Sequence, residues 1–175
     1  MKIVLLTGYA GSGKDAAAAL MAEEMDYFRT AFATPLREEV VAATGLAAHH
    51  FHDRSLKDHP LPSHGGRTPR ELLLGHAHTR WAKDPDVYAR HVAETIRLWR
   101  PHTRFVVSDW RYEREYAFLR AAFPNAEIRR VRVQRATVAP REDEPEHDLD
   151  GAAMDLVIWN DGSISDLRDA LHSSI

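Results

Sequence analysis

The chain of 175 residues has the length of one ordinary domain, and its 44% hydrophobic and 28% charged residues suffice to build and cover a sizeable core. The formal net charge of −3 argues against a protein that coats nucleic acid, while leaving room for a local basic pocket. The absence of cysteine excludes disulfides and thiolate metal sites and fits a reducing, cytoplasmic setting. We therefore expect one globular unit covering 1–175, without the roughly 18-residue apolar run that crosses a bilayer.

Apolar runs alternate along the chain with stretches of helical spacing. The predicted strands are 3–6, 29–33, 105–107, 128–133 and 155–159; the fourth alternates with arginine and is expected nearer an edge. The predicted helices are 14–25, 35–43 with Pro35 first, one capped by Thr68 and Pro69, and 113–122. This order predicts a three-layer α/β fold with a mostly parallel five-stranded sheet and helices on both faces.

Two polar segments interrupt the alternation. The first, 49–67, is rich in His, Pro, Gly and Ser, and the second, 136–150, holds two prolines and, between Glu142 and Asp148, five acidic residues. Both are predicted as surface loops or lids. A transition-metal site at His49, His50 and His52 is discounted, because no cysteine or close carboxylate supports the spacing.

The sequence Gly8-Tyr-Ala-Gly-Ser-Gly13-Lys14 fits the G-x-x-x-x-G-K pattern and lies directly between a predicted strand and a predicted helix. Such a loop wraps a phosphate with backbone N–H groups, and its lysine reaches the outer phosphates of a nucleotide. The residues predicted to hold the phosphates are Gly11, Ser12, Gly13, Lys14, Asp15 and Ala16.

Asp15 follows the loop lysine, where most such loops carry Ser or Thr to contact Mg²⁺. A carboxylate next to a triphosphate is repelled unless a cation lies between them, so Asp15 is a candidate Mg²⁺ ligand, directly or through water. Alternatively, it is an acidic residue favoured in a first helical turn.

Arginine outnumbers lysine by 19 to 4. Compositional bias explains part of this excess, but the guanidinium also binds phosphate bidentately. Six basic residues between the second and third predicted strands are candidates for holding a second, phosphorylated substrate: Arg37, Arg54, Lys57, Arg67, Arg70 and Arg80.

Asp109 and Arg111 follow the third predicted strand. Ligands bind beyond the carboxyl ends of strands in parallel sheets, so Asp109 is expected to help hold Mg²⁺ and Arg111 a phosphate. In the alternative interpretation, Asp109 only caps the helix predicted at 113–122.

Six blocks, in order, resemble the phage-type deoxynucleoside monophosphate kinases and span nearly the whole chain. They are Gly-Tyr-Ala-Gly-Ser-Gly-Lys-Asp at 8–15, Phe-Ala-Thr-Pro-Leu-Arg at 32–37, Asp-Arg-Ser-Leu-Lys-Asp at 53–58, Thr-Pro-Arg-Glu-Leu-Leu at 68–73, Ser-Asp-Trp-Arg-Tyr at 108–112 and Asn-Asp-Gly-Ser at 160–163. The resemblance implies a P-loop kinase fold, with an acceptor-binding insertion at about 35–100, and use of ATP and Mg²⁺. It also implies a homodimer, and transfer of the γ-phosphoryl group to a deoxynucleoside monophosphate.

The resemblance further assigns acceptor-phosphate contacts to Arg37, Arg54, Arg70 and Arg111, and parts of the nucleoside pocket to Gly75 and Tyr88. The chain departs from the family pattern at Ala16, at His76 and near Tyr88. Most of these departures fall around base recognition.

An acceptor phosphate is already ionised at neutral pH, so transfer to it needs positioning and charge compensation rather than a dedicated base. The expected catalytic residues are Lys14, Asp109, Arg111 and a lid arginine, Arg135 or Arg141, on a lid-like loop at about 132–150. Glu146 is a further candidate in that loop.

Two alternatives remain open from the sequence. One is a P-loop kinase with another acceptor: a modified pyrimidine nucleotide or base in DNA, dephospho-coenzyme A or phosphomevalonate. For a hydroxyl acceptor Asp109 is the candidate base. The other is a nucleotide-binding module without transfer activity, although such a module needs no second anion site.

Overall fold

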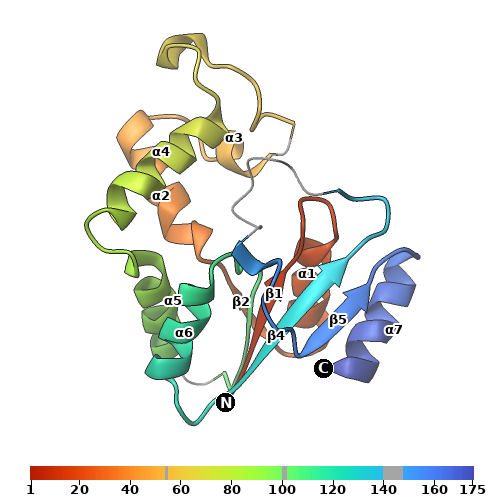
Figure 1. Ribbon diagram of the computed structural model, residues 1–175. Helices are drawn as coiled ribbons and strands as arrows, with labels where there is room; N and C mark the ends of the chain where they lie inside the picture. Colours follow the sequence, from red (N-terminus) through yellow and green to blue (C-terminus); the bar gives the residue numbers. More distant parts are fainter. Residues whose placement is uncertain (54, 100–101, 140–147) are drawn as a thin grey trace. The chain divides into compact units, whose positions relative to one another are not determined.

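A computed structural model describes residues 1–53, 55–99, 102–139 and 148–175, and Figure 1 shows their course. The chain divides into two compact units. The first unit joins Met1–Ala31 to Val92–Ile175, and the second unit is Phe32–His91. Among the described residues, no helix is long and apolar enough to cross a membrane.

The first unit is built on a sheet of five strands that all run parallel, in the order β2-β3-β1-β4-β5. The strands are β1 (Lys2–Thr7), β2 (Phe28–Thr30), β3 (Arg104–Val107), β4 (Glu127–Gln134) and β5 (Leu156–Trp159). The predicted fold class is therefore confirmed. Because β1 is the central strand, its side chains are buried on both faces, which explains its uninterrupted apolar run.

One strand prediction needs correction. The strand expected over 29–33 ends at Thr30, because the next helix already begins at Ala33. The arginine-containing strand β4 lies nearer an edge than β1, as predicted, since it is the neighbour of the edge strand β5. Its arginines are accommodated there because Arg130 and Arg132 pair with Asp155 and Asp150.

Helices cover both faces of this sheet (Figure 1). Helices α1 (Lys14–Glu24) and α7 (Ile164–Ser174) cover one face, and α6 (Glu113–Ala122) lies on the other with the Val92–Leu98 part of α5 (Val87–Leu98). Small alanines let α1 pack closely on the sheet. The buried cluster between α1, α7 and the strands includes Val4, Leu6, Ala17, Met21, Val106, Val131, Ile158, Leu167 and Leu171.

The second unit consists of helices α2 (Ala33–Thr44), α3 (His49–His52) and α4 (Pro69–Trp81), the 3₁₀ turn η1 (Pro62–His64) and the first turn of α5. The segment 49–67, predicted as a surface loop or lid, is largely exposed, but it also contains the short helix α3. Phe51 is fully buried against Val40 and Leu72, and this one apolar anchor holds α3 in place.

Helix starts follow their expected chemistry, with one shift. The Thr68 hydroxyl accepts the N–H of Glu71, whose carboxylate accepts the N–H of Thr68, so α4 begins with the predicted cap. Helix α2 begins at Ala33, two residues before Pro35. A proline is tolerated there because the first-turn N–H groups have no partner within a helix.

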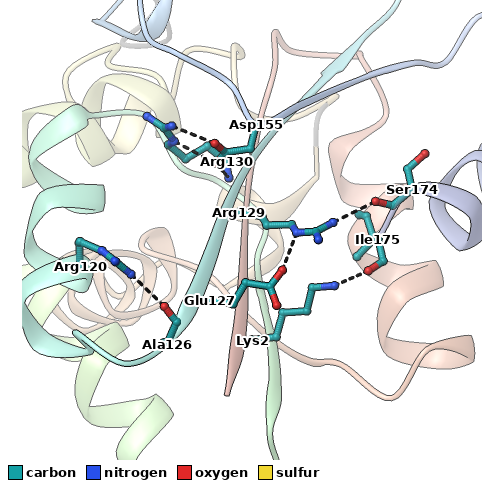
Figure 2. A network of polar contacts seen from close by, with 9 residues as sticks. All are labelled: Lys2, Arg120, Ala126, Glu127, Arg129, Arg130, Asp155, Ser174 and Ile175. Atoms are coloured by element: carbon teal, nitrogen blue, oxygen red, sulfur yellow. Dashed lines mark hydrogen bonds and ion pairs between the residues drawn. The ribbon is translucent and has the colours of Figure 1, made fainter.

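Polar contacts tie the carboxyl-terminal helix to the sheet (Figure 2). Arg129 donates to the oxygen of Ser174 over 3.1 Å and to Glu127 over 2.7 Å. Lys2 on β1 donates to the oxygen of Ile175. These contacts fix the end of α7 at the amino ends of β1 and β4, the side of the sheet away from the strand ends that carry the candidate site.

Candidate functional site

The loop after β1 has the conformation of a phosphate-binding loop. Gly8, Gly11 and Gly13 have φ values of 140°, 99° and 102°, in the region that favours glycine. Helix α1 begins at Lys14, directly after the third glycine, so its free N–H groups lie at the end of the loop. The predicted strand–loop–helix arrangement at 8–15 is therefore present.

Asn160, which follows β5, holds the loop from the side. Its amide Nδ2 donates to the carbonyl oxygen of Ser12 over 2.8 Å, and a Cβ on Gly13 would lie only 2.0 Å from that nitrogen. Gly13 is therefore required both by its backbone conformation and by the space that Asn160 occupies.

The Lys14 side chain is folded back along the loop and is 8% exposed. Its ammonium donates to the carbonyl oxygens of Gly8 and Tyr9, over 2.8 and 3.3 Å. These contacts hold the ammonium group beside the curved backbone of the loop.

A cavity of about 210 Å³ adjoins the loop. Two of its lining residues each carry a buried polar atom with no hydrogen-bond partner among the described residues, the Ser12 hydroxyl and the Nε of Arg132. Buried polar groups are nearly always satisfied, so these two atoms are candidates for contact with a bound ligand or an ordered water. The lining residues are Thr7, Gly8, Tyr9, Ser12, Arg132, Val133, Gln134, Arg135, Ala136, Val138 and Trp159.

Two arginines at the end of β4 contribute to this cavity. Arg135, predicted as a catalytic lid residue, lines it, and its Nε donates to the Asn160 oxygen over 2.7 Å. Arg132 was not predicted as a ligand; it lies 3.7 Å from Asp150 and also donates to the Leu149 oxygen. The alternation of Arg130 and Arg132 in the strand was the available signal, since it places both on one face. Arg141, Glu146 and Arg54 lie outside the described residues.

The two predicted Mg²⁺ ligands differ in environment. The carboxylate of Asp15 is 75% exposed and pairs with Arg29 on β2 over 3.0 Å, whereas Asp109 at the end of β3 is only 8% exposed. The described residues contain no group of three or more His, Asp or Glu side chains arranged to hold a metal, at His49–His52 or elsewhere. Mg²⁺ normally needs only one or two carboxylates beside phosphate oxygens and water, so a single carboxylate can suffice. Asp109 fits this role better than Asp15, because Asp109 is buried whereas Asp15 is exposed and already pairs with Arg29.

Asp109 does not cap helix α6, contrary to the alternative interpretation of its role. The cap position is Tyr112, and the buried Glu115 accepts the N–H groups of Arg111 and Tyr112, over 3.0 and 3.1 Å. Burial raises the pKa of the Glu115 carboxyl to about 8, and the charge of Asp109 acts in the same direction. Asp109 and Arg111 thus stand at the carboxyl end of β3 without a capping role.

In the second unit, basic side chains gather around α2, α3 and α4. The Nε of Arg37 is buried without a partner in the described part of the chain. Burial and the positive charges of Arg37 and Lys57 lower the pKa of His52. The Arg70 side chain pairs with Asp58 over 2.7 Å, and the backbone N–H of Arg70 donates to the backbone oxygen of Lys57. His52 was not predicted as a member of this basic group, because its place in α3 depends on the burial of its neighbour Phe51.

The residues assigned to a nucleoside pocket lie in a polar cluster centred on Glu39. Its carboxylate accepts from His76 over 3.0 Å and from the Tyr88 hydroxyl over 3.2 Å, and it pairs with Arg80 over 3.2 Å. Burial, together with Glu39, raises the pKa of Tyr88 above its usual value. Gly75 has open space around its Cα, with no atom within 4 Å of an added Cβ.

Comparisons with known proteins show the fold. No protein-family model and no curated protein matches the chain. Three solved structures are similar over nearly its whole length. An APS kinase of Mycobacterium tuberculosis is 14% identical over 98% of this chain and 94% of its own, with a TM-score of 0.50. A Thermus thermophilus protein is 20% identical over 98% of this chain and 95% of its own, with a TM-score of 0.52. A sugar kinase from Janibacter is 15% identical over 99% of this chain and 93% of its own, with a TM-score of 0.51. The chain has a P-loop kinase fold.

Proposed function

We propose that the protein is an ATP-dependent kinase that transfers the γ-phosphoryl group to a deoxynucleoside monophosphate, giving the diphosphate and ADP. One observation carries the proposal: a glycine loop of phosphate-binding shape adjoins a cavity, and two of the lining residues, Ser12 and Arg132, carry buried polar atoms without a partner in the described part of the chain. The acceptor rests on the resemblance of the six sequence blocks and on the basic group of the second unit.

On the donor side, the loop N–H groups, Lys14 and Arg132 bind the phosphates of ATP, and Arg135 compensates charge during transfer. Asp109, and less directly Asp15, would hold Mg²⁺, which supplies charge neutralisation between the phosphates when it is bound. Arg111, at the same strand end as Asp109, binds the transferring group or the acceptor phosphate.

On the acceptor side, Arg37 and Arg70 of the second unit bind the monophosphate. The buried Nε of Arg37 supports this role, because an acceptor oxygen would satisfy it. Burial is the main cause of the lowered pKa of His52, and the positive charges of Arg37 and Lys57 act in the same direction. A dianionic phosphate bound there would meet these two positive charges.

The chemistry needs no general base. An ionised oxygen of the acceptor phosphate forms a bond to the γ-phosphorus while the bond to the β,γ-bridging oxygen breaks, and that oxygen leaves with ADP. Residues of the chain therefore act by position and charge. A hydroxyl acceptor would instead require a proton to be removed, and Asp109 would then have to act as the base.

The test is ADP release with ATP and each of dAMP, dGMP, dCMP, dTMP, their ribose counterparts and a hydroxymethylated pyrimidine nucleotide. We expect at least one deoxynucleoside monophosphate to stimulate turnover, and Lys14→Ala to lower it by about a thousandfold. Lys83→Ala removes an exposed lysine and serves as the matched control. ADP release that none of the deoxynucleotides stimulates would overturn the proposal.

A further inference from the structure

Glu115 is a carboxylic side chain enclosed by the first unit, with 7% of its surface exposed. Side chains of this type are rarely buried without a specific partner. The described partners of Glu115 are backbone groups: one carboxyl oxygen, Oε2, accepts the N–H groups of both Arg111 and Tyr112. The Glu115 side chain is therefore hydrogen-bonded to the turn between β3 and α6 rather than to solvent.

That turn carries two residues of the proposed reaction, Asp109 and Arg111, on either side of Trp110. Trp110 is fully buried, its N–H donates to the Leu6 oxygen over 3.0 Å, and its indole donates to the Tyr112 oxygen over 2.8 Å. These contacts hold the middle of the turn in the core. They do not fix the peptide of Arg111, whose N–H is held by Glu115.

We propose that Glu115 is the positioning residue that holds Asp109 and Arg111 in place for phosphoryl transfer. The inference rests on the proposed function for its catalytic consequence and on the two hydrogen bonds for its geometry. Glu115 contacts neither nucleotide in this scheme. Without its side chain, two N–H groups lose their partner and the turn relaxes, and a displacement of about 1 Å near a reacting group costs on the order of a hundredfold in rate.

The choice of variants at Glu115 depends on whether its carboxyl group is charged. Burial raises its pKa to about 8, so near neutral pH the carboxyl is mainly the uncharged acid. Glutamine has the same length and keeps one acceptor oxygen, so Glu115→Gln is expected to retain both bonds. Glu115→Asp keeps the acid but withdraws the oxygen by one methylene, and Glu115→Ala removes the acceptor.

Backbone amide exchange, measured by NMR on the whole protein, tests the geometry without reference to activity. In Glu115→Ala and Glu115→Asp, the amides of Arg111 and Tyr112 are expected to exchange at least tenfold faster, about the effect of losing one hydrogen bond. In Glu115→Gln they are expected to stay within about threefold of the wild type, below the cost of one such bond. Unchanged exchange in Glu115→Ala would overturn the positioning role.

Kinetics test the consequence. For Glu115→Ala and Glu115→Asp we expect kcat to fall at least tenfold and the acceptor KM to rise, while the dissociation constant of ADP, bound at the loop after β1, changes less than about twofold. Glu115→Gln is expected to recover most of the lost kcat. Asp155→Asn is the control, because it removes a polar contact of the same unit that lies outside the proposed site.

The outcomes separate the two proposals. A wild-type protein inactive on every nucleotide overturns the proposed function, and with it the catalytic consequence, whereas the amide exchange still decides the geometry. An active wild type with normal kcat in Glu115→Asp overturns the positioning role alone. A parallel loss of kcat and ADP binding in Glu115→Asp would also overturn it, because it indicates general destabilisation.

Discussion

At the scale of single residues, the phosphate loop is specified by shape as much as by charge. The motif identifies Gly13, but only the fold shows that Asn160, distant in sequence, occupies the space where a Cβ would lie. The same holds for Arg132, whose role follows from a cavity wall rather than from a motif. Residues that act through local geometry are visible as sequence motifs, whereas residues that tertiary packing brings to the site are not.

Gly13 is constrained both by its positive φ and by the nearby Asn160 side chain. The variant Gly13→Ala should show a larger effect than backbone strain alone produces. We expect a loss of about 2 to 3 kcal/mol in unfolding free energy, since a φ of 102° strains alanine and the Asn160 contact must break. ADP affinity should fall more than about tenfold. Gly45→Ala is the matched control: its φ is 70° with open space around it, so about 1 kcal/mol and no change in ADP affinity are expected. Calorimetry and denaturant unfolding measure both effects.

Arg132→Lys should weaken nucleotide binding although the charge is kept. Lysine cannot supply a donor at the position of Nε, the atom that has no partner in the described protein. We expect the dissociation constant of ADP to rise about tenfold, the value of one charge-assisted hydrogen bond. Arg168→Lys is the control: it alters an ion pair with Glu24 and should leave the dissociation constant of ADP unchanged. Equal affinity in the Arg132 variant and the wild type would contradict the assigned contact.

At the scale of elements, the predictions succeed where a segment specifies its own structure. The strand–loop–helix over 2–24 and the capped start of α4 follow from apolar runs, glycines and caps. The prediction for 49–67 missed the short helix α3, whose buried Phe51 stands alone in a polar segment and forms no pattern. The position of β4 near the edge was predicted, but not the carboxylates of a later segment that pair with its arginines.

One such pair joins β4 to the start of β5. Arg130 binds Asp155 through two guanidinium bonds and one backbone N–H, and these contacts hold the pKa of Asp155 below its usual value (Figure 2). Asp155→Asn should lower the unfolding free energy by about 0.5 to 1 kcal/mol, a value discounted for solvent screening of this partly exposed pair.

The loss of unfolding free energy in Asp155→Asn should depend on pH, and the lowered pKa of Asp155 gives the direction. A carboxylate with a lowered pKa contributes stability above the unfolded value of about 3.9 and loses it as the pH falls through the folded pKa. The difference between wild type and Asp155→Asn should therefore be constant above about pH 5 and shrink toward pH 3. Urea unfolding across this range measures it, and a difference that grows in acid would contradict the assignment.

At the scale of the whole molecule, the two proposed phosphate-binding regions belong to different units of the chain. The second unit is inserted in the chain between β2 and β3, and it holds the basic group assigned to the acceptor, while the phosphate loop belongs to the first unit. The alternation of predicted strands and helices predicted the α/β class, but not where the chain divides. Homodimer formation stays a prediction.

The net charge of −3 leads to a prediction about polymers. We expect no measurable affinity for a single-stranded 20-mer DNA at about 0.1 M salt, because polymer binding depends on an extended basic surface that releases counterions. Fluorescence anisotropy of a labelled oligonucleotide checks this, with a mononucleotide titration as the positive control. A dissociation constant below about 10 µM would favour an acceptor within DNA.

The bond between Asn160 and Ser12 spans 148 positions of the chain, and it has a consequence for biosynthesis. The glycine loop leaves the ribosome before its neighbours β3 and β4, and Asn160 follows after all of them. The loop therefore reaches its binding shape long after it is synthesised, so a nascent chain cannot bind nucleotide in the mature geometry before residue 160 has emerged.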